Sequence, residues 1–173
     1  MSKTTIKFAI LAIVLILLQV IGLNNMCLFG VAMAFAYIYV LLHLPLDLSQ
    51  NWVLTIGFFL GLIVDVFSDT PGMASLSCTI FAALRKPVLR LYLPREEDLT
   101  DPCPSSRSIG TPAFMKYAIT MALIYCTLIY IIEAFSFFSP IRLVLRIISS
   151  TILTWLVIMG IDTLLSRSNE KRL

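Results

Sequence analysis

The stretch GFFLGLIVDVFSDTPGM (residues 57–73) decides how this chain folds, because it places an acid inside an apolar run and then turns the chain. Gly57 and Gly61 are four residues apart, a spacing that lets two helices in lipid approach closely. Asp65, the one charged residue of the run 56–67, continues the same helical ridge by one further turn. We therefore predict that Asp65 faces a neighbouring helix and not lipid.

The four residues Asp69-Thr70-Pro71-Gly72 predict a tight turn directly after this helix. Proline and glycine set backbone angles that turns require. We expect Asp69 or Thr70 to cap the next helix, with Pro71 in its first turn. The whole stretch is thus predicted to form a hairpin of two closely packed helices.

The composition excludes an ordinary soluble domain. Of 173 residues, 59% are hydrophobic and 13% are charged, whereas soluble domains carry about 25% charged residues. A chain this small cannot hide so much apolar side chain from water. The sequence predicts an all-α membrane protein that forms one polytopic domain over residues 1–173.

Six apolar segments approach the roughly 20 residues that a membrane-spanning helix needs. The fourth is the shortest, since its apolar run ends at Arg85 and Lys86, and it crosses if those two side chains snorkel. A re-entrant fourth segment is the alternative. The predicted spans are about 6–23, 26–44, 52–68, 71–91, 113–135 and 141–165.

The basic residues predict how these spans are oriented, because cytoplasmic loops are enriched in Lys and Arg. With both termini inside, all but two of the 13 basic residues are cytoplasmic, and the exceptions are Arg142 and Arg146. The three outer loops contain neither Lys nor Arg. We expect a multi-pass protein of a cytoplasmic membrane with both termini cytoplasmic.

The cytoplasmic loop of about 92–112 is the one sizeable polar segment. Its four prolines, Pro94, Pro102, Pro104 and Pro112, oppose regular structure. An acidic run lies at 96–101. A flexible loop is the simplest interpretation, and a docking site for a cytosolic partner is the alternative.

Four ionisable residues within the spans fall at similar depth near the outer surface: Asp65, Glu133, Arg142 and Arg146. Charged groups in spans are usually paired or functional. We expect the two arginines, one helical turn apart, to face the carboxylates and tie three spans together. The alternative is that Arg142, Arg146 and Glu133 reach outward to water. Asp162 fits a helix end at the inner surface.

Motifs for catalysis and metal binding are missing from the sequence. It contains no H-E-x-x-H, no G-x-S-x-G and no phosphate-binding glycine loop. The four cysteines are single, and the one histidine ends an apolar segment. We expect no enzyme activity, no cofactor, no metal and no nucleic-acid partner.

This pattern resembles the rod shape-determining MreD family of bacterial cell-envelope proteins. The resemblance covers the whole chain in length and hydropathy, but only residues 57–73 are motif-like. The matching positions are Gly57, Gly61, Asp65, Pro71 and Gly72.

The resemblance implies an inner-membrane scaffold of the elongation machinery (the elongasome), which builds lateral-wall peptidoglycan and maintains cell shape. It implies the partners MreC and, through it, MreB, a RodA-type glycosyltransferase and a penicillin-binding transpeptidase. The family is also similar in architecture to the substrate-binding S components of vitamin transporters, which supplies a rival function. Ala9 and Ala12 stand three apart in the first span, so the four-apart alanine pair often seen there in S components is missing.

Overall fold

The computed structural model describes residues 3–23, 33–70, 72–92, 103–133 and 140–170, and the regular secondary structure of this part is all helical. Its elements are α1 (Lys3–Leu17), the π-helix η1 (Leu18–Leu23), α2 (Ile38–Leu42), α3 (Gln50–Ser68), α4 (Met73–Tyr92), α5 (Ser106–Ile109), α6 (Thr111–Glu133) and α7 (Pro140–Glu170).

Three helices of the described part are long and apolar enough to cross a membrane: Gln50–Ser68, Thr111–Glu133 and Ile141–Leu165. Large apolar side chains also remain exposed along these helices. Lipid can cover such side chains, whereas water penalises them. The described part is therefore all-α, and three of its helices have the length and composition of membrane spans.

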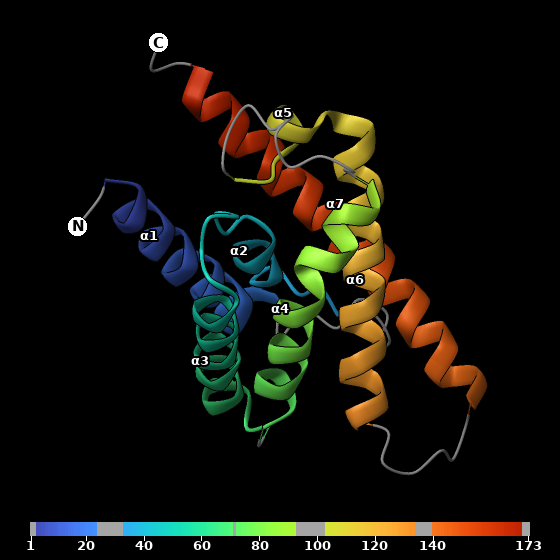
Figure 1. Cartoon of the computed structure of the whole chain (residues 1–173). Helices are drawn as coiled ribbons and strands as arrows, with labels where there is room; N and C mark the ends of the chain where they lie inside the picture. Colours follow the sequence, from blue (N-terminus) through green and yellow to red (C-terminus); the bar gives the residue numbers. More distant parts are fainter. Residues whose placement is uncertain (1–2, 24–32, 71, 93–102, 134–139, 171–173) are drawn as a thin grey trace.

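The helices α3, α4, α6 and α7 pack in series, each against the next (Figure 1). The turn from α3 to α4, the end of α6 and the start of α7 lie at the bottom of Figure 1. The last turns of α4, the start of α6 and the end of α7 lie at the top. We call these the hairpin end and the terminal end of the bundle.

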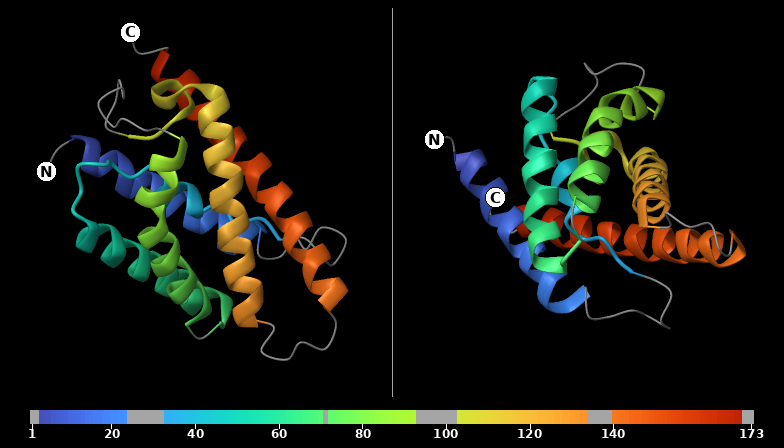
Figure 2. Two further views of the ribbon diagram at one scale, coloured as in Figure 1. Left: turned by 45° about the vertical axis from the view of Figure 1, so that its right-hand side comes forward. Right: turned by 90° about the horizontal axis from the view of Figure 1, so that it is seen from below.

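The second apolar segment differs from the continuous helix that its hydropathy predicts. Residues 33–37 are not helical, and α2 then makes little more than one turn. Residues 34–42 are all buried, and this segment passes through the middle of the bundle (Figure 2). Its backbone carries polar groups that no regular helix satisfies, so it needs partners from outside.

Those partners are polar side chains of the surrounding helices. Irregular backbone at membrane depth is tolerated only where protein groups satisfy its hydrogen bonds. Three N–H groups of the segment donate to side chains of η1 and α7: Met33 to Ser150 Oγ (3.0 Å), Phe35 to Thr154 Oγ1 (3.2 Å) and Ala36 to Gln19 Oε1 (3.0 Å). The segment is thus held by bonds from both sides.

The expectations for Arg85 and for the proline-rich loop need correction. Arg85 does not reach the surface, because it is fully buried, whereas Lys86 is partly exposed and its Nζ donates to the Leu48 carbonyl at 3.1 Å. The proline-rich loop is not wholly irregular, because α5 forms within it, with Ser105 Oγ accepting from the Ser108 N–H. Residues 93–102, with the acidic run, lie outside the described part.

Candidate functional site

The contact between α3 and α4 is closest at the two glycines that the sequence singled out. A Cβ on Gly61 would lie 2.4 Å from Ser75 Cα and 2.6 Å from the Ala74 carbonyl oxygen. A Cβ on Gly57 would lie 3.0 Å from Ala82 Cβ and from the Cys78 carbonyl oxygen. At Gly61 the two backbones touch, and at Gly57 they are nearly as close.

The carboxylate of Asp65 caps the start of α4. It is 7% exposed and accepts two main-chain hydrogen bonds, from Ala74 N and Ser75 N, each at 2.8 Å. Thr70 Oγ1 donates a third at 2.9 Å. The first N–H groups of a helix have no partner within it, and the helix dipole favours a negative charge there. The acid of one helix therefore completes the end of the next.

This geometry corrects the predicted partner of Asp65. We expected the arginines of the last helix, but both carboxylate oxygens are used by α4 and by Thr70. It also corrects the predicted cap, which we assigned to Asp69 or Thr70. The physical reason is that two main-chain donors close to an inward-facing acid satisfy it without a second buried charge.

The turn uses its residues in other ways. Asp69 adopts the left-handed conformation (φ 52°) that ends α3, and its N–H bonds to the Asp65 carbonyl. Gly72 also has positive φ (81°), which a residue without Cβ adopts freely. Pro71 lies outside the described residues. The predicted tight hairpin is present.

The other half of the expected charge cluster is a separate pair at the hairpin end. Arg146 Nη1 lies 3.5 Å from Glu133 Oε1, and both side chains are more than a third exposed. The Arg146 guanidinium also lies 5.5 Å from the centre of the Tyr130 ring. Arg142 is exposed, one turn further out. The pair joins α6 to α7 only, and α3 takes no part.

Asp162 has a larger structural role than the sequence suggested. We placed it at a helix end in the membrane surface, yet it is 3% exposed. Its two oxygens accept from Tyr39 Oη (3.1 Å) and from the N–H and hydroxyl of Ser106. Asp162 therefore fastens the interrupted segment and the start of α5 to α7 at the terminal end.

Sequence reasoning missed the polar residues that hold the interrupted segment. Gln19, Ser150 and Thr154 are buried, and each receives a main-chain N–H. Their signal in the sequence is an amide in the first apolar segment and the hydroxyl run Ser149–Thr151 in the last. Hydroxyls in apolar helices often bond their own helix, so this signal alone does not identify partners.

The buried carboxylates of the described part bond to groups of the protein itself. No group of three or more His, Cys, Asp or Glu side chains in these residues could hold a metal ion. Asp65 and Asp162 act as hydrogen-bond acceptors for main-chain and hydroxyl donors of the protein. The arrangement can hold helices together and cap them.

Comparisons with protein-family models, curated proteins and solved structures gave no match to this chain.

Proposed function

We propose that this protein is a non-catalytic scaffold of the bacterial cell-elongation machinery, of the rod shape-determining MreD type. One observation carries the proposal: the motif-like stretch builds a rigid two-helix hairpin. Gly57, Gly61 and Asp65 all point into the α3–α4 contact, where they lock the pair together. A scaffold needs such a fixed element to present a constant face to its partners.

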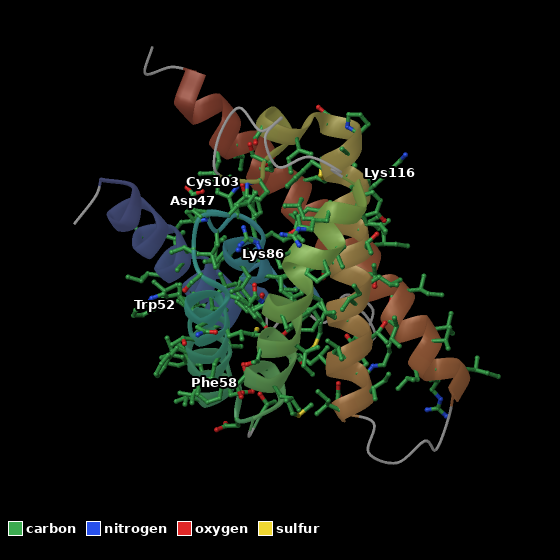
Figure 3. The ribbon with its side chains drawn as sticks, viewed as in Figure 1. Asp47, Trp52, Phe58, Lys86, Cys103 and Lys116 are labelled. Carbon is green, nitrogen blue, oxygen red and sulfur yellow. The ribbon has the colours of Figure 1, made fainter. Side chains whose placement is uncertain are left out.

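The outer face of α3 supports the same proposal. Trp52 and Phe58 project away from the bundle (Figure 3), and Phe59 and Val66 are exposed on the same helix. The glycine side of α3 packs against α4, so the opposite, apolar side of α3 is free to contact lipid or a membrane partner. We propose that it contributes to the contact with an MreC-like periplasmic coiled-coil protein.

The proposed assembly extends through that partner to MreB, a RodA-type glycosyltransferase and a penicillin-binding transpeptidase. The protein would lie in the inner membrane, with both termini and the terminal end of the bundle facing the cytoplasm. Arg85, Lys86 and Arg90 belong to the second half of α4, and Lys116 to the first turns of α6, which favours this orientation under the positive-inside rule. We propose six crossing segments, of which the second is interrupted.

Depletion in the native bacterium tests the scaffold. Loss of the protein should round the cells and reduce incorporation of labelled cell-wall precursor along the side wall. Re-expression of the wild type should restore both, whereas Gly61→Leu should not, because its side chain would separate α3 from α4. Normal shape and normal wall incorporation after complete depletion would exclude the proposal.

The interrupted second segment favours one rival, a substrate-binding S component of a small-molecule transporter. Broken helices near the membrane midplane form binding sites in many transporters. In the described part, however, this segment is packed by aromatic rings: Phe35 and Tyr37 meet Tyr125 edge-on, at centroid distances of 5.2 and 6.0 Å. Impaired vitamin uptake with unchanged cell shape after depletion would favour the transporter.

A further inference from the structure

Pro87 lies inside α4 and interrupts its hydrogen bonding. A proline has no N–H, so the Ala83 carbonyl cannot accept the helical bond that residue 87 would otherwise donate, and the proline ring crowds the same carbonyl. Prolines within helices are among the usual places where helices kink. Pro87 is therefore the point at which α4 bends most easily.

A side chain of α3 donates to the carbonyls beside this point. The amide nitrogen of Gln50 lies 3.2 Å from the Ala82 carbonyl oxygen and 3.5 Å from the Ala83 carbonyl oxygen. Gln50 is the first residue of α3, so the donor is attached to the start of a long helix. The neighbouring helix thus supplies a hydrogen bond at the place where Pro87 removes one.

The part of α4 that precedes Pro87 is held firmly on two sides. It packs against α3 at Gly57 and Gly61, where the two backbones lie closest. On the other side the Phe81 ring meets the Tyr125 ring of α6 edge-on, at a centroid distance of 5.9 Å. This part of α4 cannot change direction without separating the closely packed helices of the hairpin.

The part of α4 that follows Pro87 is held by contacts that break more easily. Leu89 is buried, and the Tyr92 hydroxyl bonds to the Thr120 hydroxyl of α6 at 2.7 Å. Leu91, in contrast, is 75% exposed. A hydrogen bond between two hydroxyls contributes little net free energy, because either group can bond to water instead. This end of α4 can therefore move while the hairpin stays intact.

We propose that Pro87 is a hinge of α4 and that Gln50 of α3 fixes its angle. While Gln50 is bound, the Ala83 carbonyl has a donor from α3, and the last turn of α4 keeps one direction. When the Gln50 bond breaks, that carbonyl takes a donor within α4, such as the Val88 N–H, and the last turn changes direction. The hinge moves the polar loop that follows α4, and it does not rest on the scaffold function proposed above.

A double-mutant cycle read by hydrogen exchange tests this proposal on the full chain in lipid nanodiscs. Gln50→Met removes the donor at similar length, and exchange at residues 88–92 should accelerate about fivefold, as for the loss of one hydrogen bond. Pro87→Ala restores an N–H to the Ala83 carbonyl, so in that background Gln50→Met should change exchange by less than about twofold. Asn51→Leu, at the next and exposed position of α3, is the control and should leave exchange unchanged.

A distance measurement shows whether the end of α4 changes direction. Spin labels are introduced as non-natural amino acids, because the chain contains four cysteines. Between the exposed positions Leu91 and Val66, Gln50→Met should broaden the distance distribution and Pro87→Ala should narrow it. The pair Leu76 and Val66, within the hairpin, should keep its distribution in both variants. Equal effects of Gln50→Met on exchange in both backgrounds, or an unchanged Leu91–Val66 distribution, would overturn the proposal.

Discussion

The Asp65 carboxylate at the end of α3 lies 2.8 Å from the Ala74 N–H at the start of α4. The two residues are nine apart, and the bond closes the turn between their helices. It makes the end of one helix depend on the beginning of the next. The hairpin is therefore one unit, and substitutions on either side of the turn should affect both helices.

Asp65→Asn should lower the free energy of unfolding by about 1–2 kcal/mol, because an amide offers one acceptor oxygen where α4 and Thr70 use two. Unfolding of the purified protein by SDS titration in mixed micelles measures this. Asp69→Asn is the control, since Asn tolerates the left-handed conformation, and it should change little. Adding Arg146→Ala to Asp65→Asn should restore nothing, and any rescue would contradict the assigned partner.

Gly61→Ala should destabilise the protein more than Gly57→Ala. At Gly61 the new methyl group would meet backbone atoms of α4 at 2.4 and 2.6 Å, and the helices must separate. At Gly57 its neighbours begin at 3.0 Å, so a small shift suffices. We expect about 3 kcal/mol for Gly61→Ala and about 1 kcal/mol for Gly57→Ala. Equal losses in the same unfolding assay would argue against this graded contact.

Thr154→Val should cost about 1–3 kcal/mol, because it leaves the buried Phe35 N–H without an acceptor at nearly unchanged volume. Thr163→Val on the same helix is the matched control. Its hydroxyl is exposed and bonds only to the Met159 carbonyl, so its loss should cost less than 0.5 kcal/mol. Hydrogen exchange at Phe35, followed by mass spectrometry, should accelerate in Thr154→Val alone.

Glu133→Gln should change stability by less than about 1 kcal/mol. The Glu133–Arg146 pair is long at 3.5 Å and partly exposed, and such pairs contribute little. The loss should shrink further at high salt, which screens exposed charges. A loss of stability as large as that of Asp65→Asn would show that the pair stabilises the fold more than exposed ion pairs do.

The sequence predicted the helices whose length is set by the hydrophobic thickness of a bilayer. The spans at 52–68, 113–135 and 141–165 match α3, α6 and α7 within a few residues, because the hydrophobic thickness of a bilayer fixes how long an apolar helix must be. The inward direction of Asp65 was also predicted, since it shares a ridge with Gly57 and Gly61. Helical periodicity is enough for both results.

The partners of the buried polar groups could not be predicted in the same way. Main-chain donors such as Ala74 N have no signature in the sequence. From the sequence alone, an acid that binds them cannot be distinguished from an acid that pairs with an arginine. The break in the second segment was hidden because Ala34 to Tyr37 are as apolar as a helix that spans the membrane. The sequence features linked to the break are the polar side chains that bind its backbone: Gln19, Ser150 and Thr154.

That arrangement has a consequence for biogenesis. The backbone of residues 33–35 bonds to side chains more than 110 positions later in the chain, which the ribosome makes after all the helices between them. Until α7 has entered the bilayer, residues 33–35 lack these hydrogen-bond acceptors and cannot pack among the other helices. Insertion must therefore reach α7 before the centre of the bundle can close. A chain truncated ahead of Ser150 should accordingly be a substrate for membrane quality-control proteases.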